Sequence, residues 1–265
     1  MISNCWVANR VDRRLFEKLN GSLEKSKTPS LSPGELILKI GKFFLGRSYR
    51  VGTLEIKGPE RLVVNLREFD CFTFVETAVA MAWCLKSRQK SFETFRRRLK
   101  KIRYRNGDVQ GYTSRLHYFS DWIYDNQKKG IIRNVTIDIG GRIFRKTINF
   151  MTRHSGSYPP LKIAVNLRRM KSVERAINRR SLYYIPKKFV RSLEDQIHDG
   201  DVIAITTKTE GLDVQHVGFA VRVKNRIHLL HASSAEGKVV LSRQTLCRYL
   251  MQGRTRSGIL VGRLV

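Results

Sequence analysis

The chain has 265 residues, 42% of them apolar, and a formal net charge of +29 at pH 7. This composition is that of a globular protein with a sizeable core and excludes a disordered chain. No apolar run is long enough for a membrane-spanning helix, and the four cysteines form neither a CxxC pair nor a disulfide framework. The charge indicates attraction to polyanions, unless it only reflects a basic proteome.

The N-terminal third has the pattern of helices. Sparse apolar positions predict a short amphipathic helix over 10–26, and two prolines and three serines indicate a loop over 26–35. Ser32, Pro33 and Glu35 have the spacing of a capped helix start. We therefore predict an N-terminal helical extension and loop over residues 1–31, followed by a single domain over residues 32–265.

The next segments predict one extended stretch followed by three helices. Residues 61–69 are expected to be extended, and residues 71–86 carry Ala, Met and Leu without Gly or Pro. This composition predicts a buried core helix. Residues 92–102 predict a basic amphipathic helix, and the aromatic-rich residues 114–129 predict another.

The C-terminal part changes to the period of two that is typical of strands. A strand pair is expected around 136–144 and a helix near 172–179, while Lys224-Asn225 has the composition of a hairpin turn. Helices first and an antiparallel sheet afterwards indicate an α+β fold. The strands expected after the helix near 172–179 cover residues 201–206, 214–223, 226–231 and 258–265.

Cys71 is the first candidate for chemistry. It follows Asp70 and opens the apolar helix, so the helix dipole and free N–H groups are expected to lower the pKa of its thiol. The N–H of Cys71 would then point toward an oxyanion on a bound carbonyl. The alternative is an inert cysteine buried as a small apolar side chain.

Two of the six histidines lie where they could serve that cysteine. His216 opens one predicted strand and His231 ends the next, so the proposed hairpin places both at the same end of the ladder. His231 could then orient the ring of His216, which would act as the base. Either histidine alone is more simply explained as a structural one.

Several segments together resemble a known family. The chain is similar to the N-acetylmuramoyl-L-alanine amidase-like proteins of the NlpC-type superfamily of papain-like cell-wall cysteine hydrolases. The resemblance covers roughly residues 32–265 and is carried by GRSYRVGTLE, LVVNLREFDCFTFVE, IRYRNG, RLHYFSDW, YYIPK, DGDVIAI, HVGFAV and LLHASS.

The resemblance implies a papain-like fold, in which a helical lobe bearing the cysteine packs on a small antiparallel sheet or barrel bearing the histidines. It implies Cys71 as nucleophile, His216 as base and His231 as the third polar residue. Tyr49 falls where relatives have a tyrosine near the thiol, and Asp70 matches the acidic neighbour of the cysteine. The implied reaction is metal- and cofactor-free hydrolysis of the N-acetylmuramoyl-L-alanine amide through a thioester.

Other candidates have weaker patterns. Residues 96–101 are a basic run that could bind phosphates, but the solvated face of an amphipathic helix is the simpler reading. Arg115 and His117 could touch substrate. Cys84 is expected to be buried packing, Cys5 and Cys247 carry no motif, and no HExxH or carboxylate cluster indicates a metal. The nearby aromatic residues could line a groove or pack in the core: Tyr112, Tyr118, Phe119 and Trp122.

Several functional alternatives stay open from the sequence. The enzyme could cleave within the peptidoglycan stem peptide, transfer an acyl group, or be a basic polyanion-binding protein with an inert cysteine. Peptidoglycan is the expected partner, and nucleic acid is disfavoured. The positive charge of the protein could hold it on anionic wall polymer. The family implies the cell envelope, yet residues 1–20 do not have the pattern of a secretory signal, so retention inside, a start placed too late and another export route remain open.

Overall fold

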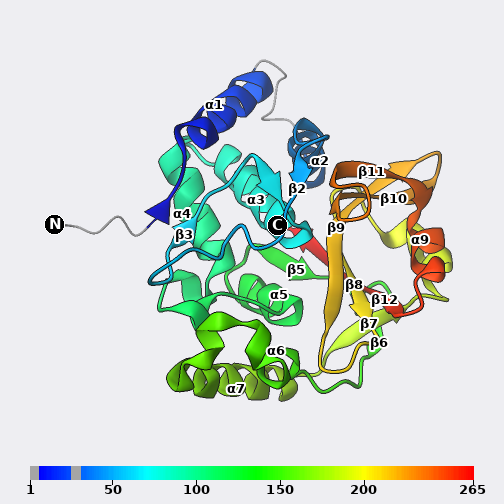
Figure 1. Cartoon of the computed structure of the whole chain (residues 1–265). Coiled ribbons are helices and arrows are strands. Elements are labelled where there is room, and N and C mark those ends of the chain that lie inside the picture. Colours follow the sequence, from blue (N-terminus) through cyan, green and yellow to red (C-terminus); the bar gives the residue numbers. More distant parts are fainter. Residues whose placement is uncertain (1–5, 25–30) are drawn as a thin grey trace.

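The computed structural model describes residues 6–24 and 31–265. Figure 1 shows the N-terminal helices on one side of the molecule and the C-terminal strands, together with the last helix, on the other, which confirms the α+β class. The helices are α1 (Arg10–Glu24), α2 (Pro33–Phe43), α3 (Cys71–Leu85), α4 (Phe92–Arg103), α5 (Phe119–Lys128), α6 (Phe150–Arg153), α7 (Ala164–Asn178), α8 (Val190–Leu193) and α9 (Leu246–Gln252).

The strands form one large sheet and one small pair. β1 (Trp6–Val7) pairs with β3 (Leu62–Val63). The 10-stranded sheet has the order β4-β2-β11-β10-β9-β8-β12-β7-β6, with β5 also paired to β12. Its strands are β2 (Ser48–Tyr49), β4 (Glu68–Phe69), β5 (Ile132–Asn134), β6 (Arg142–Ile143), β7 (Tyr183–Pro186), β8 (Val202–Thr207), β9 (Val214–Val223), β10 (Arg226–Ser233), β11 (Lys238–Thr245) and β12 (Arg256–Leu264).

The sheet is mixed, because β2 and β4 run parallel while the central strands are antiparallel. The predicted turn joins β9 to β10, and its residues Lys224 and Asn225 have positive φ angles of 47° and 61°. These angles are those of the tight turn that matches strand twist. The turn fixes the register of the hairpin, with Val223 opposite Arg226 and Phe219 opposite Leu230.

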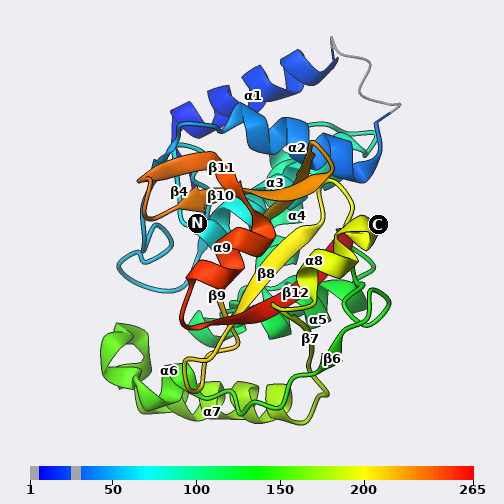
Figure 2. The same cartoon turned by 90° about the vertical axis from the view of Figure 1, so that its right-hand side faces the viewer.

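Both faces of the central sheet are covered. Val202 and Ala204 of β8 belong to the core shared with α3, whereas Ile203 and Ile205 belong to a second core with α8 and α9. This alternation follows from the period of two in a strand. Figure 2 shows α8 and α9 in front of the strands, with α3 behind them.

Helix α3 is the buried core helix that the sequence predicts. Its side chains Met81, Ala82 and Cys84 have no exposed surface, which confirms that Cys84 is a buried packing residue. Its Glu76 forms a buried ion pair with Arg103 of α4 at 2.7 Å. A pair that is buried on both sides fixes the register of the two helices, because either charge alone would be costly in the core.

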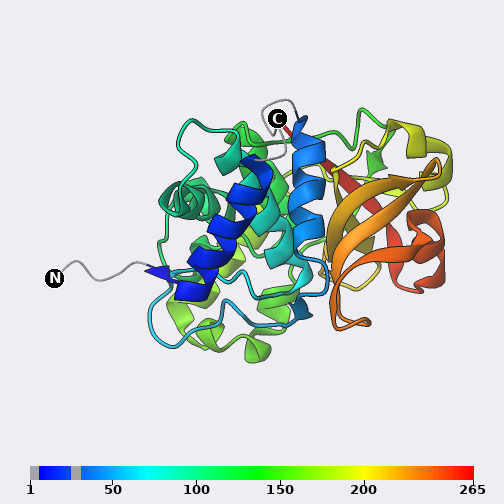
Figure 3. The ribbon, with the colours of Figure 1, turned by 90° about the horizontal axis from the view of Figure 1, so that it is seen from above.

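The N-terminal helix packs on this helical layer, as Figure 3 shows from above. Its Phe16 stacks on Phe95 of α4 with ring centroids 5.5 Å apart. Its buried Asp12 accepts a hydrogen bond from the Leu66 N–H at 2.9 Å. The division at residue 31 stays a prediction, and Cys5 and part of the expected loop lie outside the described residues.

Three expectations about the middle of the chain were wrong in detail. Residues 136–144 do not form a strand pair, because 136–140 form a turn. Strand β5, just before this turn, pairs with β12, and β6, just after it, pairs with β7. Helix α5 starts at Phe119, where Asp213 accepts the Ser120 N–H at 2.7 Å. Helix α7 is longer than the expected 172–179.

Candidate active site

Cys71 is the first residue of α3, and a capping box holds it there. The Asp70 side chain accepts the Thr73 N–H at 2.7 Å, and Thr73 Oγ1 accepts the Asp70 N–H at 3.0 Å. This reciprocal arrangement fixes the first turn of a helix. Asp70 therefore acts through the backbone as a cap, and the half-buried thiol sits at the positive end of α3.

The thiol lies where two strands of the sheet separate. β9 and β10 are paired only as far as Phe219 and Leu230. Beyond that pair, β9 continues beside β8 and β10 beside β11. Cys71 packs against the core that includes Val217 of β9, and the Val217 backbone N–H favours its ionised form.

The two histidines meet at the same place. His216 Nε2 lies 2.6 Å from His231 Nδ1, and the rings stand at 88° with centroids 4.8 Å apart. Gly218 makes room for this contact, since an added Cβ there would lie 2.8 Å from His231 Cβ. The predicted hydrogen bond is therefore present, and it leaves His216 Nδ1 unoccupied by His231.

Burial governs the charges of the site. It raises the pKa of the Cys71 thiol to about 12, Asp70 adds to the rise, and the N–H groups of Val217, Cys71 and Phe72 oppose it. The expectation of a lowered thiol pKa was therefore wrong, because desolvation outweighs the helix terminus.

The histidines are shifted in the opposite sense. Burial, followed by His231 and Arg256, lowers the pKa of His216 to about 3. Burial and then Arg256 lower the pKa of His231 to about 4. At neutral pH the site therefore holds an uncharged thiol and two uncharged imidazoles. Across the described part of the chain, no hydrogen bond joins the Cys71 thiol to either ring.

Tyr49 lies on β2 and packs against the same core as Cys71. Burial raises the pKa of its phenol to about 12, with Cys71 and Asp70 as further causes. The influence of Cys71 on this pKa indicates that the two groups are near each other. The phenol is thus protonated over the whole working range and available as a hydrogen-bond donor.

Two residues of the site were not predicted from the sequence, because no motif marks them. The Tyr249 ring of α9 lies 5.8 Å from the His231 ring and 6.3 Å from the His216 ring, between centroids. The Arg256 guanidinium lies 3.7 Å from the Tyr249 centroid and donates to the Tyr249 carbonyl. Thr245 caps α9, so a Thr followed by two leucines four residues apart was the available signal.

Arg115 and His117 have other partners. Arg115 forms ion pairs with Glu55 at 2.7 Å and Glu60 at 3.0 Å. The His117 Nε2 lies 2.9 Å from the Tyr112 carbonyl oxygen, and burial followed by Arg115 lowers its pKa to about 3. Their predicted contact with substrate stays a prediction. The aromatic candidates are core residues: Tyr112, Tyr118, Phe119 and Trp122 are all buried.

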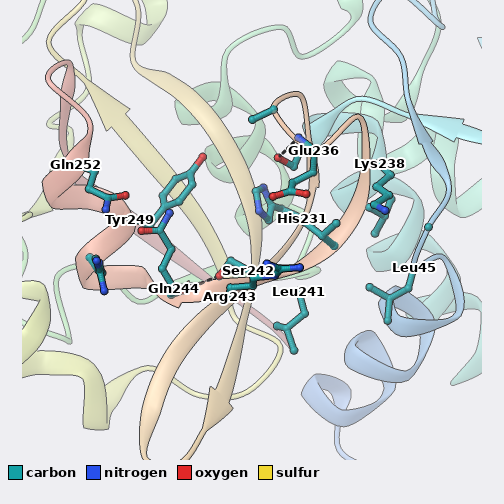
Figure 4. Close-up of a pocket in the computed structure, with 16 residues that line it drawn as sticks. Leu45, His231, Glu236, Lys238, Leu241, Ser242, Arg243, Gln244, Tyr249 and Gln252 are labelled. Atoms are coloured by element: carbon teal, nitrogen blue, oxygen red, sulfur yellow. Dashed lines mark hydrogen bonds between the residues drawn. The ribbon is translucent and has the colours of Figure 1, made fainter.

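A groove opens beside the histidines, between β10, β11 and α9. Its volume is about 770 Å³, and Figure 4 shows His231 and Tyr249 facing it. As far as the described residues go, Cys71 does not line it. Within residues 6–24 and 31–265 we find neither a cluster of three metal-ligating side chains nor a helix able to cross a bilayer.

Comparison with known proteins gives the family. Residues 39–259 match the family described as AmiA-like, N-acetylmuramoyl-L-alanine amidase-like. The chain belongs to this family. Membership in the amidase-like family supports a hydrolase that acts on peptidoglycan, and it confirms the predicted class at that level. None of the curated proteins matches the chain.

The chain is similar to several solved structures, among them that of a protein named an amidase. An N-acetylmuramoyl-L-alanine amidase from Bacteroides uniformis is 39% identical with a TM-score of 0.83, covering 88% of this chain and 98% of that one. A proposed xylanase from Bacteroides fragilis is 39% identical with a TM-score of 0.78, covering 86% and 100%. A Legionella pneumophila protein is 25% identical with a TM-score of 0.73, covering 97% and 94%.

Proposed function

We propose that the chain hydrolyses the amide between N-acetylmuramic acid and L-alanine, with Cys71 as nucleophile and His216 as base. The observation that carries the proposal is the hydrogen bond between His216 and His231 beside a thiol at a helix N-terminus. We also propose that residues 32–265 form one papain-like domain of the NlpC-type superfamily. A cysteine-bearing helix packed on histidine-bearing strands supports that placement.

The hydrogen bond between the histidines sets the role of each nitrogen. One of the two atoms must carry the proton, since two imidazole nitrogens bond only as donor and acceptor. If His216 Nε2 donates to His231 Nδ1, then His216 Nδ1 keeps its lone pair and can take the thiol proton. His231 is then a positioning residue, which also stabilises the imidazolium that forms.

Acylation follows from this arrangement. The Cys71 proton passes to His216 Nδ1 as sulfur bonds to the lactyl carbonyl carbon of the muramic acid. The carbonyl electron pair moves onto oxygen. As it returns, the C–N bond breaks and His216 gives its proton to the departing L-alanine nitrogen. The products of this half-reaction are a muramoyl thioester on Cys71 and a free stem peptide.

Deacylation uses the same groups in reverse. Water gives a proton to His216 Nδ1 as its oxygen bonds to the thioester carbon. The C–S bond then breaks, and the proton returns from His216 to the Cys71 sulfur. The released acid is the free lactyl carboxyl group of the muramic acid, and the enzyme is restored.

The oxyanion needs hydrogen-bond donors near Cys71. We assign the Cys71 backbone N–H at the start of α3 and the Tyr49 hydroxyl to this task. A raised phenol pKa keeps the Tyr49 proton in place, which an electrostatic stabiliser requires. Asp70 contributes by capping the helix that presents the N–H.

The test is digestion of purified N-acetylmuramoyl peptides by wild type and by Cys71→Ala, followed by mass spectrometry. Cys247→Ala is the matched control, because Cys247 is another half-buried thiol and lies on α9, not at the start of α3. We expect free stem peptide beginning with L-alanine from wild type and the control only. Cleavage inside the stem would identify an endopeptidase, and cleavage by Cys71→Ala would overturn the mechanism.

A further inference from the structure

The groove beside His231 is lined by more basic than acidic side chains. Lys238, Arg243 and Arg248 line it, against Glu236 as its acidic residue. None of the three cations forms an ion pair with any residue that the structure describes. By contrast, Arg226 of β10 pairs with Glu194 at 2.8 Å. The groove therefore holds positive charge that no ion pair among the described residues neutralises.

A β-bulge places one of these arginines. The register of β10 and β11 shifts between Leu230 and His228, where β11 carries extra residues. Ser242 Oγ accepts the Leu229 N–H at 3.0 Å and donates to the Gln244 carbonyl at 2.7 Å, which holds the bulge in shape. Bulges beside active sites redirect side chains. Here the bulge contains Arg243, and Figure 4 shows Arg243 beside Ser242 at the groove.

The second arginine comes from α9, the helix that also carries Tyr249. Arg248 and Arg243 line both the main groove and an adjoining cavity of about 420 Å³. Arg248 thus belongs to the same short helix that lies against the histidine pair. His231 and Tyr249 line the same groove as these two arginines.

We propose that this groove binds a carboxylate of the stem peptide, with Arg243 and Arg248 as the binding residues. The inference rests on the proposed function, in which the stem peptide is the leaving group. A stem whose second residue is a γ-linked glutamate carries a free α-carboxylate one residue beyond the scissile bond. Guanidinium groups recognise carboxylates by paired hydrogen bonds, which amidation of the carboxylate removes.

The test compares two N-acetylmuramoyl-L-alanyl-γ-D-glutamyl peptides, one with the free α-carboxylate and one with the α-amide. The variants are Arg243→Gln, Arg248→Gln and both together. Arg168→Gln with Arg175→Gln is the control, since it removes the same charge from the exposed face of α7. We expect the double variant to lose about 10- to 100-fold in kcat/KM on the acid, mainly through KM, and little on the amide.

Binding separates this inference from the proposed function. The same peptides are titrated calorimetrically into Cys71→Ala protein with and without the two arginine substitutions. Weaker binding of the acid only, in the arginine variant only, supports the groove even if no preparation cleaves either peptide. Equal losses on acid and amide, or an equal loss in the α7 control, would overturn it. Arg243→Lys and Arg248→Lys should retain part of the preference.

Discussion

His216 Nε2 lies 2.6 Å from His231 Nδ1, with the two rings nearly perpendicular. His231 itself is only 2% exposed, so its orientation is fixed by packing. In the proposed mechanism His231 Nδ1 accepts the proton of His216 Nε2, which leaves His216 Nδ1 free to act as the base.

Removing the acceptor on His231 should cost turnover and leave substrate affinity nearly unchanged. We expect His231→Ala to lower kcat by about 100-fold, the upper end for loss of a group that orients a functional histidine. His231→Asn should recover part of the rate, because its amide oxygen can accept the same proton. The measurement is steady-state hydrolysis of the muramoyl peptide. Equal rates for the Ala and Asn variants would show that His231 serves packing alone.

The resting thiol should react slowly. With a pKa raised to about 12 by burial, Cys71 is almost entirely protonated at pH 7.5, whereas an ordinary cysteine near 8.5 is partly ionised. We expect its alkylation by iodoacetamide to be at least about 10-fold slower than that of free cysteine. The alkylation rate should rise with pH until the protein unfolds in alkali.

The labelling is followed by peptide mapping in a Cys247→Ser background, so that each thiol is read separately. A rate that is already constant below pH 8 would show a thiolate–imidazolium pair in the resting enzyme. That result would contradict the neutral pair described here.

Burial should set the acid limit of activity, and Arg256 should extend it to lower pH. Its positive charge contributes to the lowered pKa of His216 and of His231. Because the base must be neutral, activity should persist well below pH 6.5 and fall as His216 becomes protonated. Replacing Arg256 by Gln removes a repelling cation, which raises the pKa of His216 and moves the acid limb of kcat/KM to higher pH. Arg254→Gln, an exposed neighbour, is the control and should leave the limb in place.

Gly218 should tolerate no side chain. A Cβ there would lie 2.8 Å from both His231 Cβ and the Leu230 carbonyl oxygen. We expect Gly218→Ala to lower the free energy of unfolding by about 1–3 kcal/mol, as for other overpacked sites, and to displace His231. Urea unfolding and hydrolysis rates measure the two effects. Gly156→Ala has open space around it and serves as the control; equal effects in both would contradict the steric argument.

Local pattern was sufficient for much of this molecule. Helix α2 could be predicted because Ser32 and Glu35 form a capping box that is visible in the sequence. The meeting of His216 and His231 was predictable because a two-residue turn fixes the register of its hairpin. In each case the contacts that determine the structure join residues close in sequence, so the local sequence is enough to predict it.

The rest depends on packing between distant segments. The thiol pKa could not be predicted, because helix position is a local property while desolvation comes from the whole fold. Tyr249 and Arg256 reach the histidines through α9 and β12, whose place beside β10 and β8 has no motif. Residues 136–144 have strand-like composition, yet the pairing partners of β5 and β6 lie elsewhere in the chain.

The position of β12 has a consequence for synthesis. This strand lies inside the sheet, paired with β8, β7 and β5, and is made after every other element described. A nascent chain can therefore fold its helical layer while the central sheet is still open. Tyr249 and Arg256 are translated after both histidines, so the histidine pair gains these two neighbours only once α9 and β12 have been made.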